Sequence, residues 1–333
     1  MKGLACILIL LMVAGWGAIT PAQAAARTWT VQTGGGAKDT SVVSNSFRPR
    51  SIEIGVGDTV KWDFLEPWTI HTVTFTSGAK EPEVEVQEGD KFFINPQVFF
   101  PSGAQTYDGT GYRNSGVAEQ GPSAPHFSYA LTFTKAGTYK YQCLLHGPGM
   151  SGTVIVRDRV SASPASLATR GKNEVLATLK SGQAAYAKWT PQKQGTKVVV
   201  PLVGDPKGGW SILRFTREPL VIKRGTTVTW DMRDPLEVHT VTFLSGEKPP
   251  DYLVIQPQKQ GPPKVLESPQ ATNPTQDKAY DGTGFRNSGQ LLAPGTPGNP
   301  PTSFSLTFTK PGRYEYWCII HAPWGMKGVV VVQ

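Results

Sequence analysis

The chain has 333 residues, of which 36 are glycine, 28 are proline and only 17% are charged. This length suits two ordinary domains, and the composition favours short strands separated by turns over long helices. The formal net charge of +8 comes without a dense run of lysine and arginine. We therefore do not expect nucleic-acid binding, whereas acidic partner proteins would be attracted.

The first 25 residues are expected to be a signal peptide. Lys2 supplies a positive charge, the stretch from Leu4 to Val13 is almost wholly apolar, and Ala22-Gln23-Ala24 resembles a cleavage site. The apolar stretch is short for a membrane span, and an uncleaved anchor is the alternative. The mature chain is expected to be periplasmic or extracellular, with no stable membrane span.

Residues 26–157 form the first predicted domain. Short runs of β-branched and aromatic residues alternate with turn signals, which is typical of an all-β fold. Two of the predicted strands, Ala130–Thr134 and Thr138–Gln142, are expected to form a hairpin. The other predicted strands are Ser51–Ile54, Thr59–Trp62, His71–Phe75 and Thr153–Val156.

Residues 158–195 differ from the segments on either side and predict a helical linker. Ser163-Pro164 is a suitable helix start. Five apolar residues, Val175, Leu176, Leu179, Tyr186 and Trp189, fall near one helical face. Gly182 weakens such a helix by about 1 kcal/mol. We expect the helix to pack on one domain, and a flexible linker is the alternative.

Residues 196–333 repeat the first domain. The run His71-Thr72-Val73-Thr74-Phe75 recurs as His239-Thr240-Val241-Thr242-Phe243, and the decapeptide from Tyr107 to Gly116 recurs from Tyr280 to Gly289. Each half is therefore expected to form a two-sheet sandwich with Greek-key connections. The stretches 78–106 and 245–279, rich in proline, glutamine, glutamate and glycine, are expected to be long surface loops.

Four of the five histidines occupy matching places in the two repeats. Each half has an upstream histidine, then Cys-x-x-His, then a methionine. The two sets are His71, Cys143, His146 and Met150, and His239, Cys318, His321 and Met326. The fifth histidine, His126, has no counterpart and is interpreted as a surface residue.

These residue types suit copper. Thiolate favours monovalent copper, while imidazole accepts both oxidation states, so two histidines and one cysteine with a weak axial methionine allow redox cycling. Zinc is an alternative for two histidines and a cysteine, but methionine is a poor zinc ligand. Cys6 lies in the predicted signal peptide. A disulfide between the other two cysteines would leave the matched histidines unexplained.

The second half resembles the plastocyanin/azurin family of cupredoxins. The resemblance rests on Asn287-Ser288-Gly289, on Phe304 to Phe308, on Pro311 to Tyr316, and on Cys318-x-x-His321 followed by Met326. The first half matches equally, except that three residues rather than four separate His146 from Met150. The resemblance implies two tandem cupredoxin domains, and one type 1 copper ion in each of the two sets of four residues.

The resemblance implies one-electron transfer with redox partner proteins, and copper storage or delivery is the alternative. Copper enzymes built from such domains need additional histidines for a second kind of copper site. No His-x-His motif occurs, and Cys143 and Cys318 have no histidine beside them. We therefore do not expect an enzyme.

Overall fold

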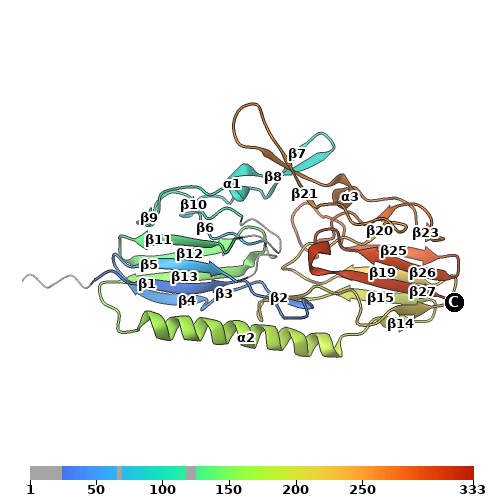
Figure 1. Ribbon diagram of the computed structural model, residues 1–333, viewed down its shortest axis with the longest axis horizontal. Helices are drawn as coiled ribbons and strands as arrows, with labels where there is room; N and C mark the ends of the chain where they lie inside the picture. The colour runs from blue at the N-terminus through green and yellow to red at the C-terminus, as the bar shows by residue number, and fades with distance from the viewer. Residues whose placement is uncertain (1–24, 66–69, 118–124) are drawn as a thin grey trace, which may run out of the picture.

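The computed structural model describes residues 25–65, 70–117 and 125–333, so the predicted signal peptide lies outside the described residues except for Ala25. The chain forms two β-sandwiches side by side, with one long helix running along both (Figure 1). The all-β fold with a helical linker is thereby confirmed. Within the described residues, no helix combines the length and apolarity needed to cross a membrane.

Each sandwich has two five-stranded sheets whose strand orders correspond. In the first half, one sheet has the order β3 (Phe47–Arg48), β1 (Thr28–Thr33), β5 (Thr59–Phe64), β11 (Ser128–Phe133), β9 (Thr106–Tyr107). The other has the order β10 (Arg113–Asn114), β6 (Thr74–Phe75), β12 (Gly137–Cys143), β13 (Gly147–Arg157), β4 (Ser51–Gly55).

In the second half, the sheet that matches the first of these has the order β14 (Gln192–Gln194), β15 (Lys197–Leu202), β19 (Thr227–Met232), β25 (Ser303–Phe308), β23 (Ala279–Tyr280). The other has the order β24 (Arg286–Asn287), β20 (Thr242–Phe243), β26 (Gly312–Trp317), β27 (Lys327–Val332), β18 (Leu220–Ile222).

The predicted hairpin between β11 and β12 is wrong. β11 pairs with β5 and β9, whereas β12 pairs with β13 and β6 in the opposite sheet. The exposed turn between them passes from one sheet to the other. Both sheets need the alternating apolar residues that suggested a hairpin, so the pattern alone does not identify the partner strand.

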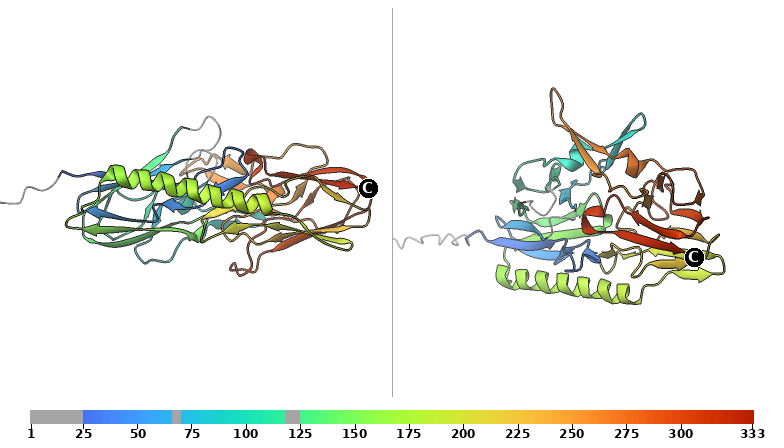
Figure 2. Two further views of the ribbon diagram at one scale, coloured as in Figure 1. Left: turned by 90° about the horizontal axis from the view of Figure 1, so that it is seen from below. Right: turned by 45° about the vertical axis from the view of Figure 1, so that its right-hand side comes forward.

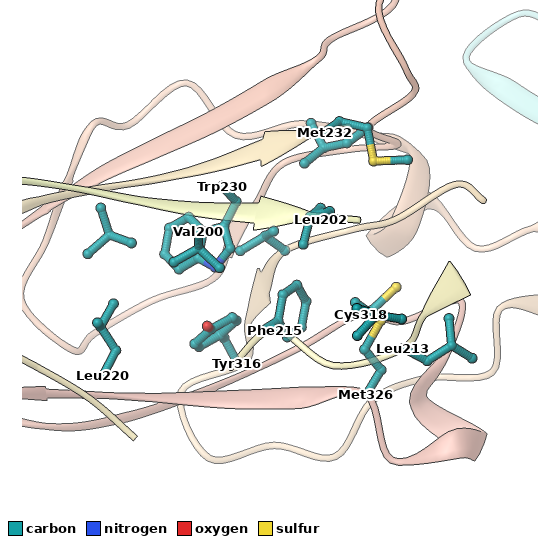
Figure 3. Close-up of a cluster of buried hydrophobic side chains, with 14 of the residues drawn as sticks. Val200, Leu202, Leu213, Phe215, Leu220, Trp230, Met232, Tyr316, Cys318 and Met326 are labelled. Atoms are coloured by element: carbon teal, nitrogen blue, oxygen red, sulfur yellow. The ribbon is translucent and has the colours of Figure 1, made fainter. Parts of the chain in front are cut away.

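The core of each sandwich is built around a fully buried tryptophan. Trp62 packs edge-on against Tyr141 with ring centroids 5.2 Å apart, and Trp230 packs in the same way on Tyr316 at 5.0 Å. Figure 3 shows this cluster in the second half, where Cys318 and Met326 lie at one end of the apolar side chains. The cysteine and methionine predicted as ligands are therefore anchored in the packed core of each domain.

The linker helix α2 (Pro164–Lys188) packs on both halves, not on one as expected. Ser163 caps its first turn by accepting a hydrogen bond from the Ser166 amide. Leu167 joins the first core, whereas Val175 and Leu179 join the second. Figure 2 shows the helix crossing beneath both sandwiches.

Gly182 in α2 is a requirement of this packing and not a defect. A Cβ atom at this position would collide with Val42 of the first half and press on Trp210 of the second. Leu176, which the sequence placed on the buried face, is instead 64% exposed. Glycine at this position lets both sandwiches approach the helix.

The two insertions are not the loosely structured loops that composition suggested. Each contributes a hairpin and a short helix: β7 (Glu85–Glu88), β8 (Lys91–Ile94) and α1 (Pro96–Phe99), and β21 (Leu253–Gln256), β22 (Lys264–Glu267) and α3 (Pro269–Thr272). The hairpins pair through β8 and β22 into one four-stranded sheet that spans the two halves. A second shared sheet joins β2 (Val42–Ser44) to β17 (Trp210–Ile212) and β16 (Gly204–Asp205).

Candidate metal centres

The first candidate centre brings together the three residues predicted from the Cys-x-x-His motif and the upstream histidine. Cys143 ends β12, His146 lies in the turn before β13, and His71 precedes β6. The Cys143 Sγ atom lies 3.2 Å from His146 Nδ1, which in turn lies 3.2 Å from His71 Nδ1. All three side chains are buried.

The second centre repeats this geometry. Cys318 Sγ lies 3.4 Å from His321 Nδ1 and 3.8 Å from His239 Nδ1, and the two Nδ1 atoms are 3.2 Å apart. Cys318 follows β26, and His321 precedes the short 3-10 helix η1 (Ala322–Trp324). His239 forms an isolated β-bridge with Leu291.

The two donor sets fit a trigonal metal ion. Bonds of about 2.0–2.3 Å in a trigonal plane would hold the ligand atoms roughly 3.5–3.8 Å apart. In each half the three ligand atoms lie within 4.8 Å of one another. Small displacements would therefore admit an ion, and the sulfur and imidazole donors are those that copper prefers.

The two predicted methionines are buried in the same cores as the cysteines. Met150 and Met326 are fully buried and belong to the same apolar clusters as Cys143 and Cys318, respectively. Each ligand loop contains a glycine with positive φ, Gly147 at 57° and Gly325 at 73°. This left-handed conformation lets the chain reverse between the histidine and the methionine.

Comparison with known proteins decides between the possible metals. A model of the copper-binding proteins of the plastocyanin/azurin family matches residues 36–157 and 206–333. The chain belongs to this family. It therefore carries two candidate copper sites, one in each cupredoxin domain, formed by His71, Cys143 and His146 and by His239, Cys318 and His321.

Individual relatives match shorter stretches. The chloroplastic plastocyanin of Physcomitrium patens is 56% identical over 34 residues, which are 10% of this chain and 20% of that protein. Two Cu(I) structures of amicyanin mutants are 24% and 25% identical, each over 39% of this chain and 82% of the other, with TM-scores of 0.24.

Cupredoxin residues that the sequence reasoning missed support the cysteines. The amides of Thr72 and Thr240 donate to the sulfur of Cys143 and Cys318, each at 3.3 Å. The hydroxyl of each threonine accepts the amide of the residue after the cysteine, at 2.9 and 2.8 Å. These bonds tie the cysteine end of one strand to the histidine segment of another.

Two asparagines that were not singled out from the sequence each accept a hydrogen bond from a second threonine of the histidine segment. Thr74 donates to Asn114, and Thr242 donates to Asn287, both at 2.8 Å. Asn114 also donates to the Val98 carbonyl, so the insertion is attached to the copper site. The exact recurrence of both asparagines within the repeated decapeptide was the available signal.

The electrostatics of each site favour a thiolate. Burial alone would raise the pKa of Cys318, but the charge of His321 and hydrogen bonds from both histidines outweigh it and lower that pKa to about 5. Burial likewise opposes the shift at Cys143, where His146 brings the pKa well below its usual range. These surroundings therefore favour the deprotonated sulfur that copper requires.

A buried carboxylate, Glu237, lies between the two copper sites and was also missed. Its Oε1 is 3.5 Å from His146 Nε2, and its Oε2 is 3.2 Å from His321 Nε2. Burial acts to raise the pKa of Glu237, but the two histidines hold it well below the usual range. The charge of Cys318 and of Glu237 overcomes burial and raises the pKa of His321 to about 10.

The remaining candidates fall outside these sites. His126 is an exposed histidine whose Nε2 lies 3.2 Å from the Asp63 carboxylate. Cys143 and Cys318 are both free and buried in separate domains, so the alternative of a disulfide is not realised.

Proposed function

We propose that the chain is an exported protein that transfers single electrons through two type 1 copper centres. The ligands proposed for the two centres are His71, Cys143, His146 and Met150, and His239, Cys318, His321 and Met326. Copper bound there would supply the one-electron step between its monovalent and divalent states.

The observation that carries this proposal is the convergence of the three donor atoms in each half. Sites that need little rearrangement between oxidation states exchange electrons with a small reorganisation cost. The threonine amides at the cysteine sulfurs stabilise thiolate. The buried methionines share an apolar cluster with the cysteines and are proposed as the weak axial ligands.

Burial of the ligands also argues for electron transfer over copper storage or delivery. The most exposed of the six histidine and cysteine ligands, His146, has only 8% of its surface accessible. Delivery requires ligands that a receiving protein can reach. Copper held by these buried side chains is expected to exchange slowly with a competing chelator.

The proposal includes no catalytic centre, because four of the five histidines are assigned to the two sites.

The net charge of +8 favours redox partner proteins with acidic surfaces. A periplasmic or extracellular location is proposed from the apolar stretch Leu4 to Val13 and the Ala22-Gln23-Ala24 segment.

Electron paramagnetic resonance of the copper-loaded protein, together with reductive cycling, tests the proposal. We expect the narrow copper hyperfine splitting of a covalent copper–thiolate bond, lost on adding ascorbate and regained on reoxidation, with copper retained against a chelator. A signal typical of nitrogen and oxygen ligands, or copper that transfers rapidly to the chelator, would favour the storage or delivery function.

A further inference from the structure

The two copper sites face each other across the junction of the domains. His146 and His321 direct Nδ1 toward their own cysteine sulfurs, and their Nε2 atoms approach one carboxylate, that of Glu237. The Glu237 side chain is only 8% exposed. Each of its oxygens contacts the histidine of a different domain.

Glu237 is held in this position by the opposite domain. Asn45, which follows β2 and is fully buried, donates through Nδ2 to Glu237 Oε1 at 2.7 Å. The same amide lies 3.1 Å from Ser211 Oγ, and the Asn45 backbone amide donates to the Gly209 carbonyl at 2.8 Å. The carboxylate is therefore oriented by groups of both halves.

In this contact the two imidazole rings can donate and the carboxylate accepts. An imidazole that binds metal through Nδ1 keeps its hydrogen on Nε2 and can donate it. A buried carboxylate is costly unless charged or hydrogen-bonded partners compensate for it, and two imidazole N–H groups with the Asn45 amide do so. Such carboxylate contacts orient metal-bound histidines and raise their basicity.

The surroundings of this contact are mostly apolar. A cavity of about 100 Å³ lies against Glu237 and both histidines, and most of its lining is apolar, including Leu145, Ile320 and Leu253. In such an environment the contacts of Glu237 with the two histidines and Asn45 are electrostatically stronger than in water.

We propose that Glu237 bridges the two copper centres and provides the route for electron exchange between them, from His146 through the carboxylate to His321. This inference rests on the proposed function. One electron passes between the centres, so that one copper is oxidised as the other is reduced, and no bond is made or broken. The Nε2 hydrogens stay on their histidines.

The sequence supplies matched variants for a test. Glu237→Gln removes the charge with little change in shape. Glu237→Thr introduces a threonine, the residue type that the first half has at the matching position, Thr69. Glu247→Gln makes the same chemical change at an exposed position in the second domain and serves as the control.

Nuclear magnetic resonance of the metal-free protein tests the contact independently of copper. We expect strongly downfield, slowly exchanging Nε2 hydrogens for His146 and His321 in the wild type and in Glu247→Gln. Both signals should shift or disappear in Glu237→Gln. Unchanged signals in that variant would overturn the bridge.

Pulse radiolysis of the full copper-loaded chain tests the route. Less than one electron is added per chain, and Cys143→Ser and Cys318→Ser, which each retain one centre, supply reference spectra. We expect a redistribution phase, independent of protein concentration, that slows about 10–100-fold in Glu237→Gln and Glu237→Thr. An unchanged rate in both, with both copper bands intact, would overturn the route.

Two further outcomes separate the possible failures. Absence of copper–thiolate bands from the wild type would refute the proposed function and the electron route with it, while the metal-free spectra would still decide the contact. If the Glu237 variants did not fold, Asn45→Ala, which lies one contact further from the histidines, should slow redistribution by a smaller factor; an unchanged rate there would overturn the inference.

Discussion

The two domains have the same three-residue copper site but differ in what surrounds it. In the second domain the Asp234 carboxylate lies 3.9 Å from His239 Nε2, and both side chains are fully buried. Glu66 stands at the matching position of the first domain, outside the described residues. The second domain also supplies Glu237 for both sites. The shared ligands determine the kind of metal site that each domain forms. The loops before His71 and His239 carry different residues, which can give the two sites different reduction potentials.

The largest expected effect comes from removing one cysteine at a time. Cys143→Ser and Cys318→Ser should each abolish one copper–thiolate band and leave the other, because the two donor sets share no ligand. Visible absorption and copper analysis of the purified variants check this. Loss of both bands from a single substitution would show that the sites do not form independently.

Replacing the methionines tests whether the two ligand loops are equivalent despite their different lengths. Met150→Leu and Met326→Leu should keep the copper–thiolate band and shift the reduction potential of the altered site by on the order of 60 mV, a tenfold change in the redox equilibrium. Potentiometric titration measures the shift. A change at Met326 alone would mean that Met150 is not a ligand.

Glu267 offers a comparison outside the copper sites, at the sheet shared by the two insertions. Burial and the neighbouring Glu85 raise the pKa of Glu267 to about 8. The folded state therefore holds more protons than the unfolded state as pH rises from the ordinary glutamate range toward 8, so stability falls across that window. Glu267→Gln should flatten this dependence and stabilise the protein by about 1–3 kcal/mol at pH 8.

Chemical denaturation of the metal-free protein between pH 5 and 8 provides the measurement. Glu247→Gln, at an exposed site, is the control and should follow the wild type. A Glu267→Gln variant that lost as much stability with rising pH as the wild type would contradict the assignment of the protonated carboxyl to this cluster.

The smallest expected effect concerns Asp234, because its contact with His239 is the longest of those discussed. A nearby negative charge stabilises the more positive, oxidised form of the site. Asp234→Asn should therefore raise the potential of the second centre by up to about 60 mV, or 1.4 kcal/mol, and leave the first unchanged. Equal shifts at both centres would show that the domains are not electrostatically distinct in this way.

The sequence predicted most of what one domain can specify by itself. The repeat located both sandwiches, and the spacing from Cys143 to His146 and from Cys318 to His321 selected residues that meet in space. The helix from Pro164 was predicted from its cap and apolar spacing. These features depend on local periodicity and on the internal repeat, which a single sequence displays.

Features that join the halves could not be predicted in this way. The pairing of β8 with β22 links residues more than 170 positions apart, and their composition resembles that of surface loops. Glu237 departs from the repeat, since Thr69 occupies its place in the first domain, so comparing the halves gave no reason to select it. Gly182 is unfavourable in an isolated helix, and the reason for it is found only in the packing of Val42 and Trp210 from the two halves against this position.

A copper titration of the purified protein, followed by visible absorption, tests whether each domain forms a copper–thiolate site. We expect an intense thiolate-to-copper band that grows linearly and stops at two copper ions per chain, and that ascorbate bleaches completely. A band that stopped at one ion would leave one domain without a working site. A protein that bound copper without developing the band would contradict the proposed ligand geometry in both domains.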